Sequence, residues 1–364
     1  MFYSCAPAAT RIAAPAHRAI ARKGNRSLTV DIHCHVISPA ADELVKDVFT
    51  PEADPLFKFS GQRTLAVNRK QAADIRDRIT KIKPRLQAMD KMGVDMQVIS
   101  VAPPQYFYWT EPELGRATAR IINDNIASIV HAYPDRFVGL GHLPMQKPTF
   151  ALAELERCAK ELGMRGVELC TNVDGKELAE TEFEPVFARL EALGMVVFLH
   201  PGGFTHGERL REHYLNNVIG NPLESTIAVS HLIFGGVLDR HPKLKVVVAH
   251  GGGFLGSYPF RMDHAWRARA DCRVNIKKKP TDYLRRLYFD TIMFDPRALG
   301  YLIDLWGADH VMLGTDYPYD MGDYDPLGAI AAVKKLKVTE RNAISGGNAA
   351  RLLGLKRQTA PKRR

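Results

Sequence analysis

The sequence has few cysteines and no long apolar run. Its 364 residues include only five cysteines, widely scattered and without a Cys-x-x-Cys pair. A chain of this length with so few cysteines is not built on a disulfide framework, and a reducing cytoplasmic location fits it better. No stretch approaches the roughly 18 uninterrupted apolar residues of a spanning helix. A disulfide scaffold and an integral membrane protein are therefore excluded.

Acidic residues are absent from both ends of the chain. The basic residues of 1–30 and 356–364 account for the net charge of +10, so the body between them is neutral. A nucleic-acid surface needs a basic stripe on the folded domain, which this distribution does not provide. Residues 1–28 are rich in Ala and Arg, as organellar targeting segments are, but Pro7 and Pro15 interrupt a long amphipathic helix. We expect a disordered extension there, and import into an organelle is not excluded.

The body alternates short β-branched apolar runs with stretches of helical period. This alternation is typical of parallel strands connected by helices. The length suits one barrel domain, which we place at residues 29–355. The eight predicted strands are Leu28–His33, Met96–Val101, Phe137–His142, Gly166–Cys170, Val196–His200, Lys245–His250, Leu287–Thr291 and Val311–Asp316. The sequence therefore predicts a TIM (β/α)₈ barrel, although strand counting does not exclude an open doubly wound sheet.

One segment, Ser38–Lys83, does not follow this alternation. It is charged, contains three prolines, and forms an insertion after the first strand, where loops of a barrel lie over the active-site mouth. Helices are predicted between the other strands, among them Glu177–Leu193, Glu224–Arg240 and Phe254–Arg267. Extra helices follow the last strand at 327–336 and 339–353, before a basic tail at 356–364.

Polar residues interrupt the apolar strands at their carboxyl ends. These residues are His33 and His35 on strand one, His200 on strand five, His250 on strand six and Asp316 on strand eight. Residues two apart on a strand point the same way, so His33 and His35 can both face the barrel interior. A core has no use for such groups unless they bind something. A single histidine at a strand end is more often a structural residue. The presence of all five polar residues at strand ends is what indicates a binding site.

The residue types at these strand ends suit a divalent metal ion. Three imidazoles and one carboxylate are typical ligands of Zn²⁺, and also of Mn²⁺, Fe²⁺ or Co²⁺. We assign His33, His35, His200 and Asp316 as ligands of one ion, most simply Zn²⁺. His250 is assigned as the general base beside the metal-bound water, because a neutral imidazole suits that work near pH 7.

Three glycines, Gly251 to Gly253, follow His250. We predict that they begin a helix at the barrel rim. A glycine-rich turn at a helix start can bind an anion through backbone N–H groups. The glycines can equally make room for substrate or for a neighbouring loop, and the sequence leaves both interpretations open.

At these residues the sequence resembles the amidohydrolase superfamily, in the branch of aminocarboxymuconate-semialdehyde decarboxylase and related aromatic-acid decarboxylases. The likeness extends from about residue 30 to 355. It rests on DIHCH at 31–35, MDKMGVDMQVIS at 89–100, FLHP at 198–201, AHGGG at 249–253, RMDHAWRAR at 261–269, VMLGTDYPY at 311–319 and ISGGNAARLLGL at 344–355.

The resemblance implies a zinc-dependent C–C bond cleavage that releases CO₂ without a redox cofactor. It implies the same four ligands, the same base, and a homodimer or higher homo-oligomer. Arg261 would reach a substrate carboxylate across the dimer interface, and a helix-surface salt bridge is the alternative. A second substrate arginine belongs to the loop after strand one, where Arg69 and Arg76 are candidates. Strand four carries Glu168 and Cys170 rather than a lysine, which agrees with a single metal ion.

One departure concerns the pocket wall. Family members commonly show Trp and Asp after the strand-five His-Pro, where this chain has Gly202, Gly203 and Phe204. A changed wall beside an intact ligand set indicates the same chemistry on a different acid.

Three functional hypotheses follow. The leading one is a metal-dependent non-oxidative decarboxylase of an aminocarboxymuconate semialdehyde or a related hydroxylated aromatic acid. The alternative is a metal-dependent hydrolase of a lactone, ester or amide, because the same ligands can also serve a metal hydroxide. A non-catalytic barrel would be favoured if a ligand were missing, and none is. The expected partner is a small carboxylic acid, with no nucleic acid and no membrane.

Overall fold

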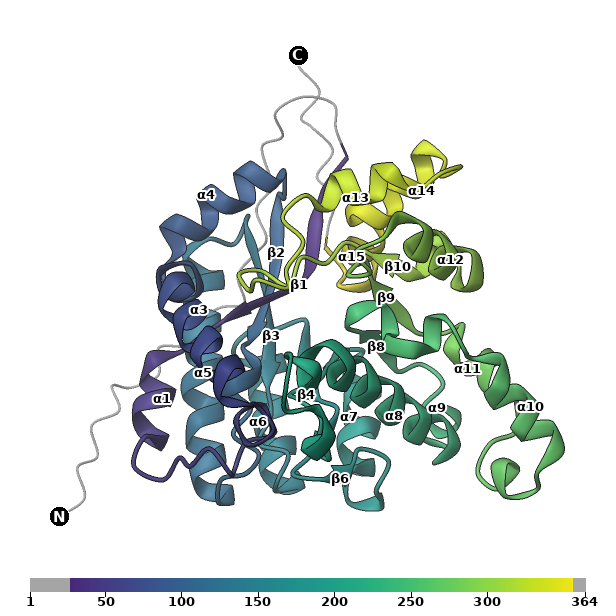
Figure 1. Cartoon of the computed structure of the whole chain (residues 1–364), viewed down its shortest axis with the longest axis horizontal. Helices are drawn as coiled ribbons and strands as arrows, with labels where there is room; N and C mark the ends of the chain where they lie inside the picture. Colours follow the sequence, from purple (N-terminus) through teal and green to yellow (C-terminus); the bar gives the residue numbers. More distant parts are fainter. Residues whose placement is uncertain (1–26, 356–364) are drawn as a thin grey trace.

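The chain folds around eight parallel strands (Figure 1). A computed structural model describes residues 27–355, so the predicted extension at 1–28 lies almost wholly, and the tail at 356–364 wholly, outside the described part. The strand order is β1-β2-β3-β4-β7-β8-β9-β10, in which each strand of this sheet pairs with the next strand of the same sheet along the chain. The strands are β1 (Val30–Val36), β2 (Met96–Val101), β3 (Phe137–His142), β4 (Gly166–Cys170), β7 (Val196–His200), β8 (Lys245–Val248), β9 (Tyr288–Asp290) and β10 (Val311–Met312).

Hydrogen bonds between the first and last strands complete the ring. The Ile32 N–H donates to the Leu313 carbonyl at 2.9 Å, and the His35 N–H donates to the Tyr317 carbonyl at 2.9 Å. The predicted barrel is therefore confirmed, and the open sheet is wrong. Four predicted strands, β2, β3, β4 and β7, have the predicted bounds. β1 continues past His35 to Val36, while β8 and β10 end before His250 and Asp316.

Helices surround the barrel and fill the insertion (Figure 1). They are α1 (Pro39–Val45), α2 (Pro55–Lys58), α3 (Gln62–Thr80), α4 (Ile82–Met92), α5 (Pro112–Ala132), α6 (Pro148–Lys160), α7 (Glu184–Leu193), α8 (Asn221–Phe234), α9 (Val237–Arg240), α10 (Phe260–Ala268), α11 (Pro280–Leu284), α12 (Pro296–Trp306), α13 (Pro326–Ala332), α14 (Val338–Asn342) and α15 (Asn348–Leu352). A two-stranded hairpin, β5 (Asn172–Val173) and β6 (Lys176–Glu177), precedes α7. None of the helices in residues 27–355 combines the length and apolar character needed to cross a bilayer.

Several predicted helices are shorter or interrupted. The helix predicted from Glu177 begins only at Glu184, because residues 176–177 pair in the hairpin. The helix predicted over Glu224–Arg240 is broken at Gly235 and Gly236, where Gly236 has φ of 77°, a conformation that ends helices. The insertion contains the long helix α3, which the sequence analysis did not identify.

The barrel interior is a separate apolar cluster, distinct from the layer between strands and helices. It takes alternate residues from neighbouring strands, such as Val98, Leu140 and Phe198, and is covered by α15. In β1 this alternation changes, because the pairing with β2 shifts register between Asp31 and Cys34. Such a bulge turns the following side chains to a new face.

Candidate metal centre

Five polar side chains meet at the carboxyl end of the barrel. His33 and His35 come from β1 and His200 ends β7, while His250 and Asp316 lie just after β8 and β10. One donor atom each of His33, His200, His250 and Asp316 lies within 4.8 Å of the others. His35 belongs to the same cluster, since its Nε2 atom is 3.1 Å from His33 Nε2 and 3.3 Å from Asp316 Oδ1. The structure therefore brings together every residue that was predicted to bind the metal.

The nitrogen and oxygen atoms that could bind a metal face one another and have few hydrogen-bond partners. His200 Nε2 is buried and has no hydrogen-bond partner among the described residues. The ring centroid of His200 lies 4.9 Å from that of His33 and 4.8 Å from that of His35. Unshared imidazole nitrogens crowded beside a carboxylate are costly in a core unless a cation binds them. The donor set and its geometry therefore fit a divalent metal ion.

Each of the three predicted imidazole ligands is held through its other ring nitrogen. His33 Nδ1 is 2.6 Å from Asp290 Oδ2, and His35 Nδ1 is 2.8 Å from the Val101 carbonyl oxygen. His200 Nδ1 lies 3.2 Å from the hydroxyl of Tyr106. A hydrogen bond donated by Nδ1 leaves the Nε2 lone pair for a metal and fixes the ring orientation. The Nε2 atoms thus point inward as ligands should.

His250 differs from these three histidines. Its Nδ1 atom is buried without a hydrogen-bond partner among the described residues, and its Nε2 atom is 3.8 Å from Asp316 Oδ2. Its side chain is 16% exposed, whereas those of His33 and His35 are fully buried. A partly exposed ring that is not held through Nδ1 suits proton transfer better than ligation.

The charges of the cluster are strongly coupled. Although burial opposes protonation, the carboxylates of Asp316 and Asp290 raise the pKa of His33 to about 10. Burial also opposes ionisation of Asp316, but the neighbouring His33 and His250 hold its pKa well below the usual value. Burial and the adjacent histidines lower the pKa of His200. Without a metal, Asp316 is therefore an anion, His200 is neutral and His33 is protonated, so a metal ion that binds His33 must displace its proton.

Asp290 is a functional residue that the sequence analysis missed. Besides holding His33, its carboxylate accepts hydrogen bonds from the backbone N–H groups of His250 at 2.9 Å and Gly251 at 2.8 Å. It is fully buried at the end of β9. Its position at a strand end was the available signal, the same signal that identified Asp316.

The glycines after His250 make room for their neighbours. They do not begin a regular helix, since Gly251 and Gly252 have φ of 61° and 78°. A Cβ atom would come within 2.1 Å of Met293 at Gly251 and within 2.2 Å of the Pro222 carbonyl at Gly253. The Gly251 N–H already binds Asp290. The packing therefore favours the steric interpretation over an anion site.

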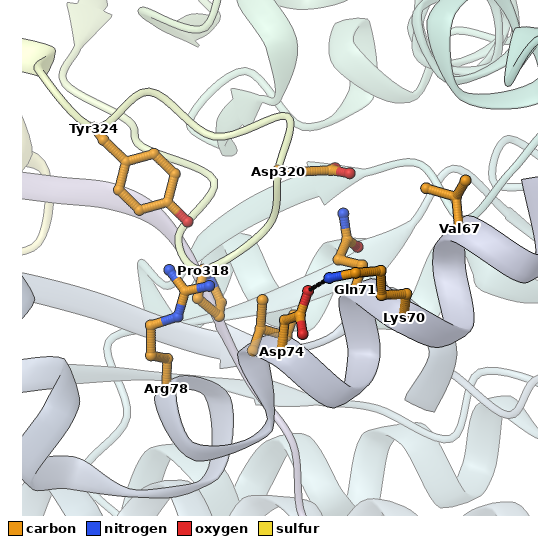
Figure 2. A pocket seen from close by; sticks show the side chains of 9 residues that line it. Val67, Lys70, Gln71, Asp74, Arg78, Pro318, Asp320 and Tyr324 are labelled. Carbon is orange, nitrogen blue, oxygen red and sulfur yellow. Dashed lines mark hydrogen bonds and ion pairs between the residues drawn. The ribbon is translucent and has the colours of Figure 1, made fainter.

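Two adjoining pockets lie between α3 and the loop after β10. The larger, of about 380 Å³, is lined by α3 residues including Arg78 and by Pro318, Asp320 and Tyr324 (Figure 2). The second, of about 260 Å³, shares Asp320 and contains Arg63 and Tyr214. Burial, then Asp320 and Asp316, raise the pKa of Tyr214, which lies in the lining of the second pocket.

The predicted substrate arginines lie on exposed surfaces. Arg69 and Arg76 are exposed on α3 and line neither pocket. Arg261 is exposed on α10, which lies at the periphery of the molecule (Figure 1). No acidic group within residues 27–355 forms an ion pair with Arg261. The alternative of a helix-surface salt bridge therefore has no support in the described part of the chain.

Comparison with known proteins identifies the family. The sequence model of the amidohydrolase family matches residues 30–355. The chain belongs to the amidohydrolase family. A 2-amino-3-carboxymuconate-6-semialdehyde decarboxylase from Dictyostelium discoideum is 35% identical over 335 residues, which cover 91% of this chain and 92% of that protein.

Solved structures of two decarboxylases share the barrel. The 5-carboxyvanillate decarboxylase of Sphingomonas paucimobilis superposes with a TM-score of 0.81 at 27% identity, covering 91% of this chain and 100% of that chain. The dihydroxybenzoic acid decarboxylase of a Polaromonas species, solved with manganese and the inhibitor 2-nitroresorcinol, has a TM-score of 0.78 at 25% identity. This superposition covers 92% of this chain and 98% of the Polaromonas chain. This amidohydrolase is thus similar over its whole barrel to decarboxylases.

Proposed function

We propose that this amidohydrolase is a metal-dependent, non-oxidative decarboxylase of an aminocarboxymuconate semialdehyde or a related hydroxylated aromatic acid. The observation that carries the proposal is the cluster of His33, His35, His200, His250 and Asp316 at the barrel mouth. The relatives described above act on acids of these kinds, which favours decarboxylation over hydrolysis.

In this proposal His33, His35, His200 and Asp316 hold one divalent ion. When bound, that ion supplies a Lewis acid that polarises an oxygen of the substrate or of water. Zn²⁺ is the expected ion, and the manganese in the Polaromonas enzyme makes Mn²⁺ the main competitor. Elemental analysis of protein purified without added metal distinguishes the two.

His250 is proposed as the proton-transfer group. Loss of CO₂ replaces a C–C bond by a C–H bond, so the carbon that loses the carboxylate must receive one proton. His250 Nε2 lies beside Asp316 and its ring reaches the open side of the cluster, where a substrate would enter. Because its ring is not held through Nδ1, it can exchange protons without disturbing the ligands.

Arginines at the rim are proposed to bind the substrate carboxylate, for which their bidentate guanidinium groups are suited. Of the arginines in the insertion, Arg78 and Arg63 line the pockets and are better placed than Arg69 and Arg76. Arg261 is proposed to act in a homodimer. Its exposure, and the exposed Tyr258 and Phe260 beside it, suit a surface that a second subunit covers.

A cytoplasmic location stays a prediction. Cys34, Cys158, Cys170 and Cys272 are free thiols, as expected in a reducing compartment.

The test is a CO₂-release assay on protein reconstituted with Zn²⁺ or Mn²⁺. The substrates are aminocarboxymuconate semialdehyde and a panel of ortho-hydroxybenzoates, and the control is the Asp316→Ala variant. Release that depends on metal and is absent in the variant supports the proposal and identifies the substrate class. Hydrolysis of lactones by protein that binds about one metal ion per chain and releases no CO₂ would favour the alternative function.

A further inference from the structure

The environment of His200 contains two residues to which the sequence analysis gave no role in ligand binding. Tyr106 follows a 3₁₀ turn after β2, and Glu168 lies in β4, next to β7 and His200. The Tyr106 hydroxyl donates to Glu168 Oε1 at 2.6 Å and lies 3.2 Å from His200 Nδ1. All three side chains are buried.

The order of the hydrogen bonds decides which tautomer His200 adopts. A tyrosine hydroxyl has one hydrogen, and Tyr106 donates it to Glu168 Oε1 at 2.6 Å, a much closer acceptor than the His200 carbonyl oxygen at 3.3 Å. The hydroxyl oxygen can then only accept, so the hydrogen between Tyr106 and His200 must be carried by His200 Nδ1. His200 Nε2 is left with a free lone pair, and this is the buried atom that has no partner among the described residues.

We propose that Tyr106 and Glu168 are a positioning pair that fixes the tautomer and orientation of His200 for metal binding. Glu168 fixes the direction of the Tyr106 hydrogen, and the Tyr106 oxygen accepts a hydrogen bond from the N–H of His200 Nδ1. The inference depends on the metal centre and not on which acid is decarboxylated.

This arrangement differs from those at the other two histidine ligands. His33 is bonded directly to a carboxylate and His35 to a backbone carbonyl. His200 reaches its carboxylate only through the hydroxyl of Tyr106. Removing one oxygen atom therefore separates His200 from Glu168 while both residues stay in place.

The test is Tyr106→Phe, with Tyr108→Phe as its matched control. Tyr108 is also buried, its ring stacks on that of Tyr106 at 5.9 Å, and its hydroxyl takes no part in these hydrogen bonds. The metal Kd of each apoprotein is measured by chelator competition. Loss of a group that orients a metal ligand typically weakens binding by about 10–100-fold, and we expect this for Tyr106→Phe. Tyr108→Phe should stay within about twofold of wild type.

Two further measurements separate positioning from general damage. The absorption spectrum of the Co²⁺-loaded protein reports ligand geometry and should change in Tyr106→Phe but not in Tyr108→Phe. Glu168→Gln should weaken metal binding too, and the double variant should be no weaker than Tyr106→Phe, because both residues act through one hydrogen-bonded chain. Additive losses, or a metal Kd within about twofold of wild type in Tyr106→Phe, would overturn the proposal. These readouts require no substrate, so a failed decarboxylase assay leaves them interpretable.

Discussion

The metal cluster and the pocket rim are built in different ways. The proposed ligands lie on barrel strands or in the segments that follow them and are almost fully buried, and the three histidines are oriented by hydrogen bonds to Asp290, Val101 and Tyr106. The arginines proposed to bind substrate lie on α3 and α10, outside the barrel wall, with side chains that reach solvent. If the proposed function is right, the barrel scaffold holds the reacting groups and the more exposed helices around it meet the substrate. Changes in the cluster should abolish chemistry, whereas changes in the rim should alter binding.

The largest effect is expected from Asp316→Ala. Asp316 is the only carboxylate among the proposed ligands, and its negative charge attracts the cation. Its removal should abolish metal binding and reduce turnover to background. Elemental analysis and the CO₂ assay measure the two effects on one sample. A variant with full metal content and full turnover would remove Asp316 from the site.

His250→Asn should separate metal binding from catalysis. Because the His250 ring is not held like the ligands, metal content should stay near one ion per chain. Turnover should fall by about 10²–10⁴-fold, the usual contribution of a general acid–base group. Equal loss of metal and activity would show that His250 is a ligand instead.

Arg261→Ala tests whether the rim includes a second subunit. The variant alone should bind substrate weakly, with KM raised by tenfold or more, because a charged hydrogen bond is lost. If Arg261 acts across a dimer, mixing the Arg261→Ala variant with the inactive His250→Asn variant forms heterodimers. One site of each heterodimer then has both residues intact. About a quarter of the wild-type activity should return when the subunits exchange freely. Absence of recovery in dimers shown to exchange would place Arg261 in its own subunit's site or outside any site.

Substitutions on the two faces of α3 should differ in their effect on substrate binding, and this effect is smaller than that of Arg261→Ala. Arg78→Met should raise KM several-fold with little change in kcat, because Arg78 lines the larger pocket. Arg69→Met, on the exposed face of the same helix, is the matched control and should leave KM unchanged. The reverse result would favour the prediction made from sequence for Arg69.

The smallest effect concerns Asp54, which caps α2 in the insertion and is buried. Burial raises its pKa to about 7. The folded state therefore binds more protons than the unfolded state between about pH 4 and 7, and this residue makes stability fall as pH rises through that window. Asp54→Asn keeps the oxygen that accepts from Leu56 and removes this dependence. Between about pH 4 and 7, the free energy of unfolding of Asp54→Asn relative to wild type should rise with pH by at most about 1.4 kcal/mol per pH unit. Urea unfolding of both proteins at several pH values measures this difference. A difference independent of pH would contradict this.

The strands were predictable because their pattern is local. Runs such as Val196–His200 are apolar on both faces, which only a buried parallel strand requires, and the observed bounds match. Helix starts were less predictable. The helix predicted from Phe254 begins only at Phe260, after an irregular segment at His250–Gly256 in which Gly251, Gly252 and Gly253 have positive φ.

The sequence by itself determined the barrel and the set of polar residues at its mouth. Both follow from short-range periodicity and from the rule that parallel strand ends meet at one edge. That these residues bind a metal ion stays a proposal. Only the tertiary structure decided how the side chains are oriented, because Asp290 is 257 residues from His33 and Tyr106 is 94 residues from His200. It also decided which face of α3 lines the pockets, since that depends on how the insertion packs against the loop after β10. Contacts between distant segments leave no periodic signal in the chain.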